Sequence, residues 1–221
     1  MNIKNLPNFF IIGAAKSGTT ALFDVLNQHP DVYFPYQKEP NFFSNEKLYS
    51  KGLEWYEKTY FKNAAGYPAR GEASPHYIYW ADIKIIAMFR DPVERAYSQY
   101  WMLAHRELED LTFSEALECE EERLKNNHDE LYMVGSLRYG YYRGGQYASL
   151  LQPYLSHFPR KNLHFILLDD LQHDFSNTMR KLASFLDIDS NFVFNPTASN
   201  PAYVPKSKKL HRFLHHPTGP L

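Results

Sequence analysis

The chain has 221 residues, of which 44% are hydrophobic and 22% charged, as is ordinary for a globular protein. This length predicts a single domain over residues 1–221, with enough chain to bury a sizeable core. The formal net charge of −1 gives no overall attraction to nucleic acid, so no nucleic-acid partner is expected. Cys119 is the one cysteine, which excludes an internal disulfide and a zinc site built on thiolates.

Targeting signals are not evident in the sequence. Residues 1–7 lack the basic and long apolar regions of a signal peptide, and no run approaches the roughly 20 apolar residues that span a bilayer. We therefore expect a cytoplasmic protein without membrane insertion; a domain cut from a longer anchored chain is the alternative. The composition leaves the oligomeric state open.

The first half of the chain alternates extended and helical patterns. The apolar run at residues 8–13 predicts a strand. The helix after it should span residues 18–28 and end at His29, because a residue before proline disfavours the helical conformation. Further along, we expect a short strand, a loop, a short helix and a second loop at residues 32–34, 35–44, 52–60 and 64–70.

The second half begins with an apolar segment at residues 83–89, which predicts a fully buried strand. A helix should start at Pro92 with Asp91 as its cap. A capping box of Thr112 and Glu115 should open another helix, running to about residue 125. Later patterns predict a helix, a strand and a helix at residues 145–158, 163–168 and 175–186.

Some of these helices have apolar side chains on one face, whereas the acidic run at residues 118–122 should lie on a solvated face. The helix after Pro92 groups Val93, Ala96, Tyr97 and Tyr100 on one face. The inward side chains expected in the last two helices are Tyr147, Leu150, Leu151, Tyr154 and Leu155, and then Met179, Leu182 and Phe185.

Strands that alternate with helices predict an α/β protein of three layers, a P-loop-like fold with a central parallel sheet flanked by helices. Ligands of such sheets sit beyond the carboxyl ends of the strands. The polar residues that follow strands or short extended pieces should therefore converge on one cleft. They are Lys16, Glu39, Glu72 and Arg90.

The segment IIGAAKSGTTAL, residues 11–22, carries the strongest functional signal. Its order of strand, glycine-containing turn and helix builds an anion cradle, because the first N–H groups of a helix are unpaired and its dipole favours negative charge. Gly13 and Gly18 let the backbone bend around an oxyanion, and Lys16 adds a mobile charge. The pattern predicts binding of a phosphate or sulfate ester; an ordinary turn with a solvated lysine is the alternative.

The position of the lysine separates this segment from the nucleotide P-loop, GxxxxGK[ST], in which lysine directly follows the second glycine. Here Lys16 precedes Gly18 by two positions. The strand at residues 83–89 ends in Arg90, which suits a metal-free phosphate site better than a site with Mg²⁺-holding carboxylates. A P-loop nucleotide kinase is therefore the second hypothesis.

Three stretches together resemble the sulfotransferases that use 3′-phosphoadenosine 5′-phosphosulfate (PAPS), most of all the bacterial and heparan-sulfate-type branch. They are GAAKSGTTAL at residues 13–22, KEPNFFS at 38–44 and FRDPVERAYSQYW at 89–101. The other matching segments are GEASPHY at 71–77, RGGQYASLL at 143–151 and PKSKK at 205–209. The resemblance implies sulfuryl transfer from PAPS to a hydroxyl or amine of a carbohydrate or small-molecule acceptor, with PAP as product and no metal required.

The resemblance also implies which residues hold the nucleotide. PAPS carries a 5′-phosphosulfate and a separate 3′-phosphate, so its site needs two anion cradles. Arg90 can take the 3′-phosphate in bidentate fashion, with Ser98 two helical turns further on. The full set of implied contacts is Ala15, Lys16, Ser17, Gly18, Thr19, Thr20, Arg90, Ser98, Arg143, Lys206 and Lys208.

Each of these assignments has a plain structural alternative. Arg90 could form a salt bridge to Asp91 or Glu94, and Ser98 could simply pack its helix. The tail lysines could belong to a solvated end of the chain.

The catalytic roles follow from the same resemblance. Sulfuryl transfer is similar to phosphoryl transfer, with in-line attack and charge building on the leaving oxygen. Lys16 would stabilise that oxygen, and Glu39 would accept the proton of the acceptor. A surface pair with Lys38 is the alternative for Glu39, and His105 is the alternative base.

The chain departs from the family pattern at three places. Ala73 stands where heparan-sulfate-type enzymes carry a lysine, so one catalytic cation is missing or replaced. The connection between Tyr79 and Ile83 is too short for the helix expected there, and the chain stops at Leu221, before an expected terminal helix. Either the domain is shortened at these places or residues are absent. A non-catalytic PAP- or PAPS-binding module is the third hypothesis.

Overall fold

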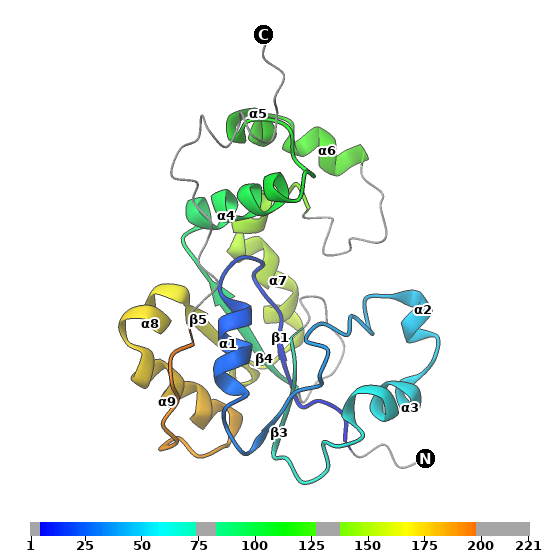
Figure 1. Ribbon diagram of the computed structural model, residues 1–221, viewed down its shortest axis with the longest axis vertical. Helices are drawn as coiled ribbons and strands as arrows, with labels where there is room; N and C mark the ends of the chain where they lie inside the picture. Colours follow the sequence, from blue (N-terminus) through cyan, green and yellow to red (C-terminus); the bar gives the residue numbers. More distant parts are fainter. Residues whose placement is uncertain (1–4, 74–82, 127–137, 198–221) are drawn as a thin grey trace.

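The computed structural model describes residues 5–73, 83–126 and 138–197. Its centre is a 5-stranded sheet in the order β2-β3-β1-β4-β5 (Figure 1). All neighbouring strands pair in parallel, which confirms the expected α/β fold. The strands are β1 (Phe9–Ile11), β2 (Val32–Tyr33), β3 (Ala69–Glu72), β4 (Lys84–Phe89) and β5 (Leu163–Leu167).

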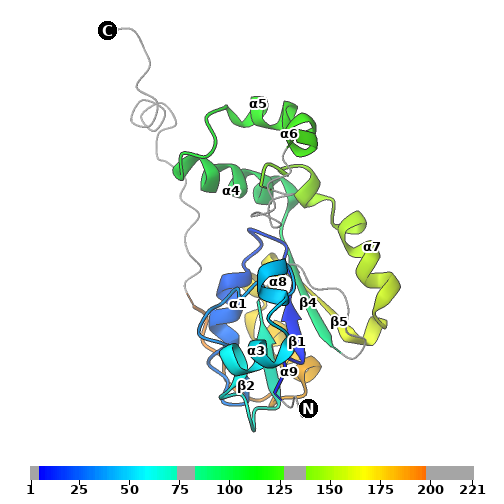
Figure 2. The ribbon, with the colours of Figure 1, turned by 90° about the vertical axis from the view of Figure 1, so that its right-hand side faces the viewer.

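Helices cover both faces of the sheet (Figure 2). One face carries α1 (Thr19–Leu26), α8 (Leu168–His173) and α9 (Phe175–Leu186), and the other carries α7 (Tyr147–His157). Both faces of the sheet can bind helices because successive side chains of a strand point to opposite faces. Phe9 and Ile11 belong to the cluster under α1, α8 and α9, whereas Phe10 and Ile12 belong to the cluster under α7. The three layers predicted from the sequence are therefore present.

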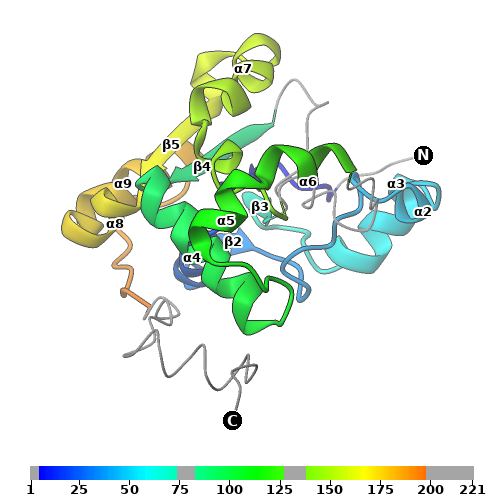
Figure 3. The same ribbon diagram turned by 90° about the horizontal axis from the view of Figure 1, so that it is seen from above.

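A further group of helices stands over the carboxyl end of the sheet (Figures 1 and 3). It consists of α4 (Pro92–His105), α5 (Phe113–Glu118) and α6 (Glu120–Asn126), with α4 nearest the strands. Both predicted caps are confirmed: the side chain of Asp91 accepts from the first turn of α4, and Thr112 and Glu115 form the capping box of α5. No helix within the described ranges is long and apolar enough to cross a membrane.

The remaining helices lie beside β2 and β3. They are α2 (Glu46–Tyr49), α3 (Leu53–Tyr56) and a π-helix (Glu57–Phe61) that continues α3. Phe42, Tyr56 and Phe61 are completely buried there and pack with Tyr33 of β2. The short helix predicted at residues 52–60 is thus present with a π-helical second half.

Several elements were not predicted, among them α2, β3 and α8. The expected loop at residues 64–70 is wrong in its last part, because Ala69 and Arg70 begin β3. This strand has no apolar pattern of its own; its pairing with β1 and β2 decides its conformation. A Cβ at Gly71 would lie 2.2 Å from the ring of Phe9, so the glycine provides room between strand and side chain. The helix α8, which follows β5 directly, was also missed.

Several predicted helix faces and boundaries are wrong. Val93, Leu150 and Leu155 are 68%, 38% and 51% exposed, because α4 stands over the sheet and α7 covers only part of one face. The helix expected to about residue 125 breaks at Cys119, which caps α5. The helix expected from residue 145 begins at Tyr147, because a 3₁₀ turn (Arg143–Gly145) precedes it. Glu120, placed on a solvated face, is 3% exposed because it binds backbone N–H groups.

Candidate functional site

The turn at residues 13–18 joins β1 to α1 and has the backbone of an anion cradle. Gly13, Lys16 and Gly18 have positive φ values of 127, 67 and 89°, a region that favours glycine. A Cβ at Gly18 would also lie 2.8 Å from Cδ1 of Leu168, so a larger residue would have to displace that side chain. Because Gly18 is the N-cap of α1 and has no side chain, the first N–H groups of α1 stay available to a ligand.

Ser17 lies inside this turn and is completely buried. Its N–H donates to the carbonyl of Ala14 at 3.2 Å, which closes the turn. Its hydroxyl oxygen has no hydrogen-bond partner within the described residues. A buried polar group without a partner is unfavourable by about 1–3 kcal/mol, so the arrangement fits a site that binds an oxyanion.

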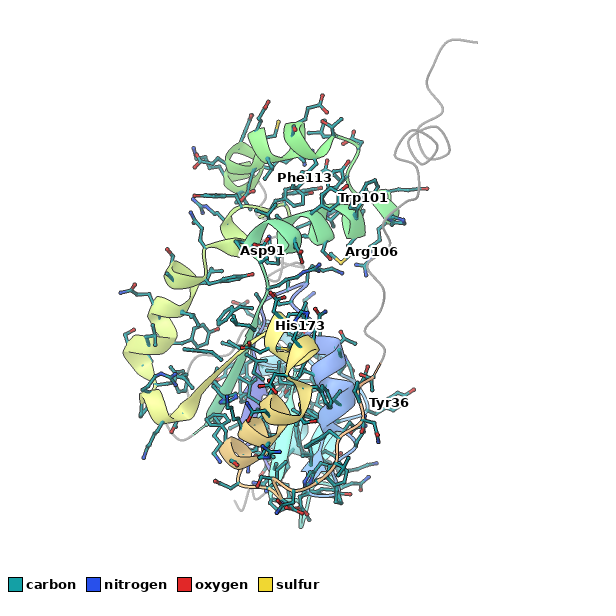
Figure 4. The ribbon with its side chains drawn as sticks, turned by 90° about the vertical axis from the view of Figure 1, so that its left-hand side faces the viewer. Tyr36, Asp91, Trp101, Arg106, Phe113 and His173 are labelled. Carbon is teal, nitrogen blue, oxygen red and sulfur yellow. The ribbon has the colours of Figure 1, made fainter. Side chains whose placement is uncertain are left out.

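Lys16 is half-buried close to two arginines. Burial lowers the pKa of its ammonium group most, followed by the charges of Arg106 and Arg90. Arg90 directly follows β4, and Arg106 is the C-cap of α4. Figure 4 shows Arg106 and Asp91 at opposite ends of α4, on the side of the helix towards the sheet. The cations of separate elements therefore create a positive potential at the turn.

Lys38 ties the loop after β2 to the first turn of α1. Its Nζ donates to Oγ1 of Thr20 at 2.9 Å and to Oε1 of Glu39 at 3.1 Å. The carbonyl of Glu39 accepts from the side-chain amides of Gln37 and Asn41. The pair with Lys38 that the sequence offered as an alternative is therefore formed, and it holds the carboxylate beside the anion cradle.

Arg90, the residue predicted for the second anion site, is engaged by Glu94. Its Nε and a terminal nitrogen both lie 3.0 Å from Oε2 of Glu94, so the salt bridge named as an alternative is formed. The backbone of Arg90 is held separately, by the hydroxyl of Tyr147, which donates to its carbonyl at 2.8 Å. The side chain of Glu94 is 61% exposed, and such surface pairs are weak enough for a phosphate to replace them.

Ser98 and Arg143, which were also predicted to contact the nucleotide, belong to different elements. Ser98 is half-buried on α4. Arg143 is exposed and begins the 3₁₀ turn that packs on α4. The packing is close, since a Cβ at Gly145 would lie 2.8 Å from Cβ of Pro92. The fold thus brings the turn that begins with Arg143 to the start of α4, close in sequence to Arg90.

Three further residues named from the sequence are His105, Lys206 and Lys208. His105 is exposed at the far end of α4, where its Nδ1 is 2.7 Å from the carbonyl of Trp101. Lys206 and Lys208 fall outside the described residues. Glu72, which was expected in the cleft, is completely buried and accepts a hydrogen bond from the hydroxyl of Tyr56, so it anchors the core beside the site.

Sequence reasoning missed the residues that support the site. Arg106 lies beyond the matched segment at residues 89–101, and Tyr147 was expected only as an inward side chain of its helix. Arg95 lies inside the segment 89–101 but was given no role, and Glu120 lies in an acidic run. Nothing in the local pattern separates Glu120 from its exposed neighbours. Only the path of the chain, which brings residues 140–145 between α4 and α6, gives these side chains their partners.

The fold and the turn define an α/β protein of the P-loop-like class, with an anion cradle at the carboxyl end of its sheet. Residues 6–212 match the model of the sulfotransferase domain family. The chain belongs to this family.

Individual relatives agree with the family match. Heparan sulfate glucosamine 3-O-sulfotransferase 3B1 of Mus musculus is 33% identical over 224 residues, covering 90% of this chain and 52% of that protein. The chain spans about half the length of the curated relatives it matches first. The crystal structure of a sulfotransferase from Alicyclobacillus acidocaldarius is 31% identical, with a TM-score of 0.74 and coverage of 96% of this chain and 90% of that chain. A mouse sulfotransferase crystallised with PAP, 21% identical with a TM-score of 0.51, shares the fold over 84% of this chain and 61% of that chain.

Proposed function

We propose that this chain transfers a sulfuryl group from PAPS to a hydroxyl or amine of a carbohydrate or small-molecule acceptor. The observation that carries the proposal is the joint position of Lys16, Arg90 and the buried hydroxyl of Ser17 at the carboxyl end of the sheet. The carbohydrate acceptor is favoured by the names of the curated relatives, which act on heparan sulfate glucosamine.

The described residues fit the two anionic ends of PAPS. The turn at residues 13–18, with the hydroxyl of Ser17 and the N–H groups of α1, would hold the 5′-phosphosulfate. Arg90 would hold the 3′-phosphate after exchanging its contact with Glu94, and Ser98 and Arg143 would add contacts from α4 and from the 3₁₀ turn that packs on it.

The chemistry follows from the side chains that surround this turn. When bound, PAPS supplies an activated sulfuryl group. Lys16 would stabilise the negative charge that develops on the leaving phosphate oxygen. Glu39 would accept the proton of the acceptor. Lys38 holds the carboxylate of Glu39 beside the first turn of α1, and the acceptor would replace Lys38 as its hydrogen-bond donor.

Ligand binding and transfer should be tested separately. In a thermal shift assay PAP should stabilise the protein, by about 2.7 kcal/mol at a concentration of 100 Kd. Stabilisation by ATP with Mg²⁺ and not by PAP would point to the kinase hypothesis instead. Labelled PAPS with a panel of saccharide and small-molecule acceptors then tests transfer. Binding of PAP without transfer to any acceptor would favour the non-catalytic module. That hypothesis is based on Ala73, which is buried and uncharged where related enzymes carry a lysine.

The role of Glu39 is tested by Glu39→Gln. The amide keeps the shape but cannot accept a proton, so kcat should fall by about 10²–10⁴-fold while the Kd of PAP stays nearly unchanged. Glu46→Gln is the matched control, because Glu46 is an exposed glutamate in the first turn of the next helix. An unchanged kcat in Glu39→Gln would remove Glu39 as the base and leave His105 as the candidate.

A further inference from the structure

Residues 140–143 form a short crossing segment between α4 and α6, and charged side chains satisfy its backbone. Arg95 of α4 is 1% exposed. One of its terminal nitrogens donates to the carbonyl of Gly140 at 3.1 Å and also to the carbonyl of Tyr141. The segment's acceptors are thus bound from the α4 side.

The donors of the same segment are bound from the α6 side. Glu120 is 3% exposed, and its two carboxylate oxygens accept from the backbone N–H groups of Tyr142 and Arg143 at 2.7 and 2.8 Å. Charged groups make stronger hydrogen bonds than neutral ones, so this carboxylate fixes the start of the 3₁₀ turn firmly. Burial lowers the pKa of Arg95, whereas the charge of Glu120 acts in the opposite direction.

The segment leads directly onto the predicted 3′-phosphate site. A Cβ at Gly144 would lie 2.7 Å from Cζ of Arg95, so the turn rests on that guanidinium without space between them. Tyr147, at the end of this turn, binds the carbonyl of Arg90. The helices α5 and α6, which lie away from the sheet in Figure 1, are therefore connected to the site through Glu120.

We infer that Glu120, together with Arg95, is a positioning residue that sets Arg143 beside Arg90 and so gives the protein its preference for nucleotides with a 3′-phosphate. This assignment rests on the proposed function. Neither side chain touches the nucleotide; both act by fixing the backbone in advance, which reduces the entropy lost when the phosphate binds.

The ligand pair that tests this inference is PAP and adenosine 5′-phosphate, which differ in the 3′-phosphate. In Glu120→Gln the amide can accept only one of the two N–H groups and opposes a donor to the other. By isothermal titration, the Kd of PAP should rise about tenfold, as expected for an unsatisfied buried donor, while the Kd of adenosine 5′-phosphate stays unchanged. Loss of a negative charge alone would have the opposite sign, since it would favour an anionic ligand.

Glu122→Gln is the matched control, because Glu122 is an exposed glutamate of the same helix, and its affinities should equal those of the wild type. If Glu120→Gln does not fold, Glu120→Asp keeps the charge but is too short for both N–H groups, and should show the same selective loss. Equal weakening of both ligands, or an unchanged ratio, would overturn the inference while the proposed function stands. A wild type without preference for PAP would overturn both, and this is visible before any variant is made.

Discussion

The two regions proposed to bind the anionic ends of the nucleotide are built in different ways. The turn at residues 13–18 consists of consecutive residues, and its shape comes from left-handed backbone angles at Gly13, Lys16 and Gly18. The region around Arg90 is assembled from distant parts of the chain, with Tyr147 binding its backbone across 57 residues. The first region therefore depends on local conformation and the second on tertiary contacts.

The two regions also differ in how their charges are matched. Lys16 has no carboxylate partner within the described residues, and burial, followed by the neighbouring arginines, raises the free energy of its charged form. Arg90 is already paired with Glu94. Substitution of Lys16 should therefore change the chemical step, whereas substitution of Arg90 should change affinity for the nucleotide.

Among substitutions in these two regions, the largest effect is expected for Lys16→Ala. Removing one group that stabilises developing charge lowers kcat by about 10²–10³-fold, and turnover should become undetectable in most assays. Alanine keeps the Cβ, so the left-handed strain at this position is unchanged and folding should be preserved. Arg90→Ala should instead mainly raise the KM of PAPS. Steady-state kinetics of both variants should be measured, with the exposed Lys58→Ala as control. An equal fall of kcat in Lys16→Ala and Arg90→Ala would contradict the proposed difference between the two regions.

The sequence predicts the first region well because every part of it is local. The apolar run, the two glycines and the helix start lie within residues 9–22, and the positive φ values at Gly13 and Gly18 are what their residue type permits. The central strands and α9 are predicted for the same reason, since their apolar periods are complete within each segment.

The second region is predictable only in part. Arg90, Pro92 and the cap at Asp91 follow from a local motif, but the partner of Arg90 and the burial of Glu120 do not. Those depend on which segments the fold brings together, and a charged run gives the same local signal whether it is solvated or bound to N–H groups. The strand β3 was missed for a related reason, because its residues ARGE form a strand only between β1 and β2.

The backbone of the turn is tested by Gly18→Ala against Gly66→Ala. Both glycines have nearly the same φ, 89 and 88°, so alanine should destabilise the left-handed conformation at each by about 1–2 kcal/mol. Only Gly18 is also crowded, by Cδ1 of Leu168, whereas nothing lies within 4 Å of a Cβ at Gly66. Gly18→Ala should therefore lose more stability in denaturant unfolding and also lose affinity for PAP. If Gly18→Ala and Gly66→Ala lost the same stability and the same affinity for PAP, the backbone of the turn would have no specific role in binding.

The positive potential at the turn is tested by Arg106→Gln. The charge of Arg106 lowers the pKa of Lys16, so its removal should raise that pKa. If protonated Lys16 is needed, kcat/KM falls as pH rises through the pKa of the free enzyme, and this alkaline limb should move to higher pH in the variant. The exposed Arg180→Gln removes the same charge from α9 and should leave the limb in place. A limb that does not move in Arg106→Gln would exclude Lys16 as its source.

The smallest effect is expected for Glu94→Gln, and it has the opposite sign from the others. Glu94 competes with a phosphate for the guanidinium of Arg90, and an i,i+4 pair on a helix surface is worth about 0.2–0.5 kcal/mol. Its loss should therefore lower the Kd of PAP about twofold. Removal of a negative charge could also tighten binding through space, so the single variant does not separate the two causes.

The double variant Arg90→Ala with Glu94→Gln separates them. Without the guanidinium there is no pair to break, so Glu94→Gln should have no effect on the Kd of PAP in the Arg90→Ala background. A gain that persists in this background would be a long-range charge effect, and it would also weaken at high salt. That result would mean that the pair with Glu94 does not compete with the phosphate for Arg90. The region around Arg90 would then differ from the turn at residues 13–18 only in being built from distant parts of the chain.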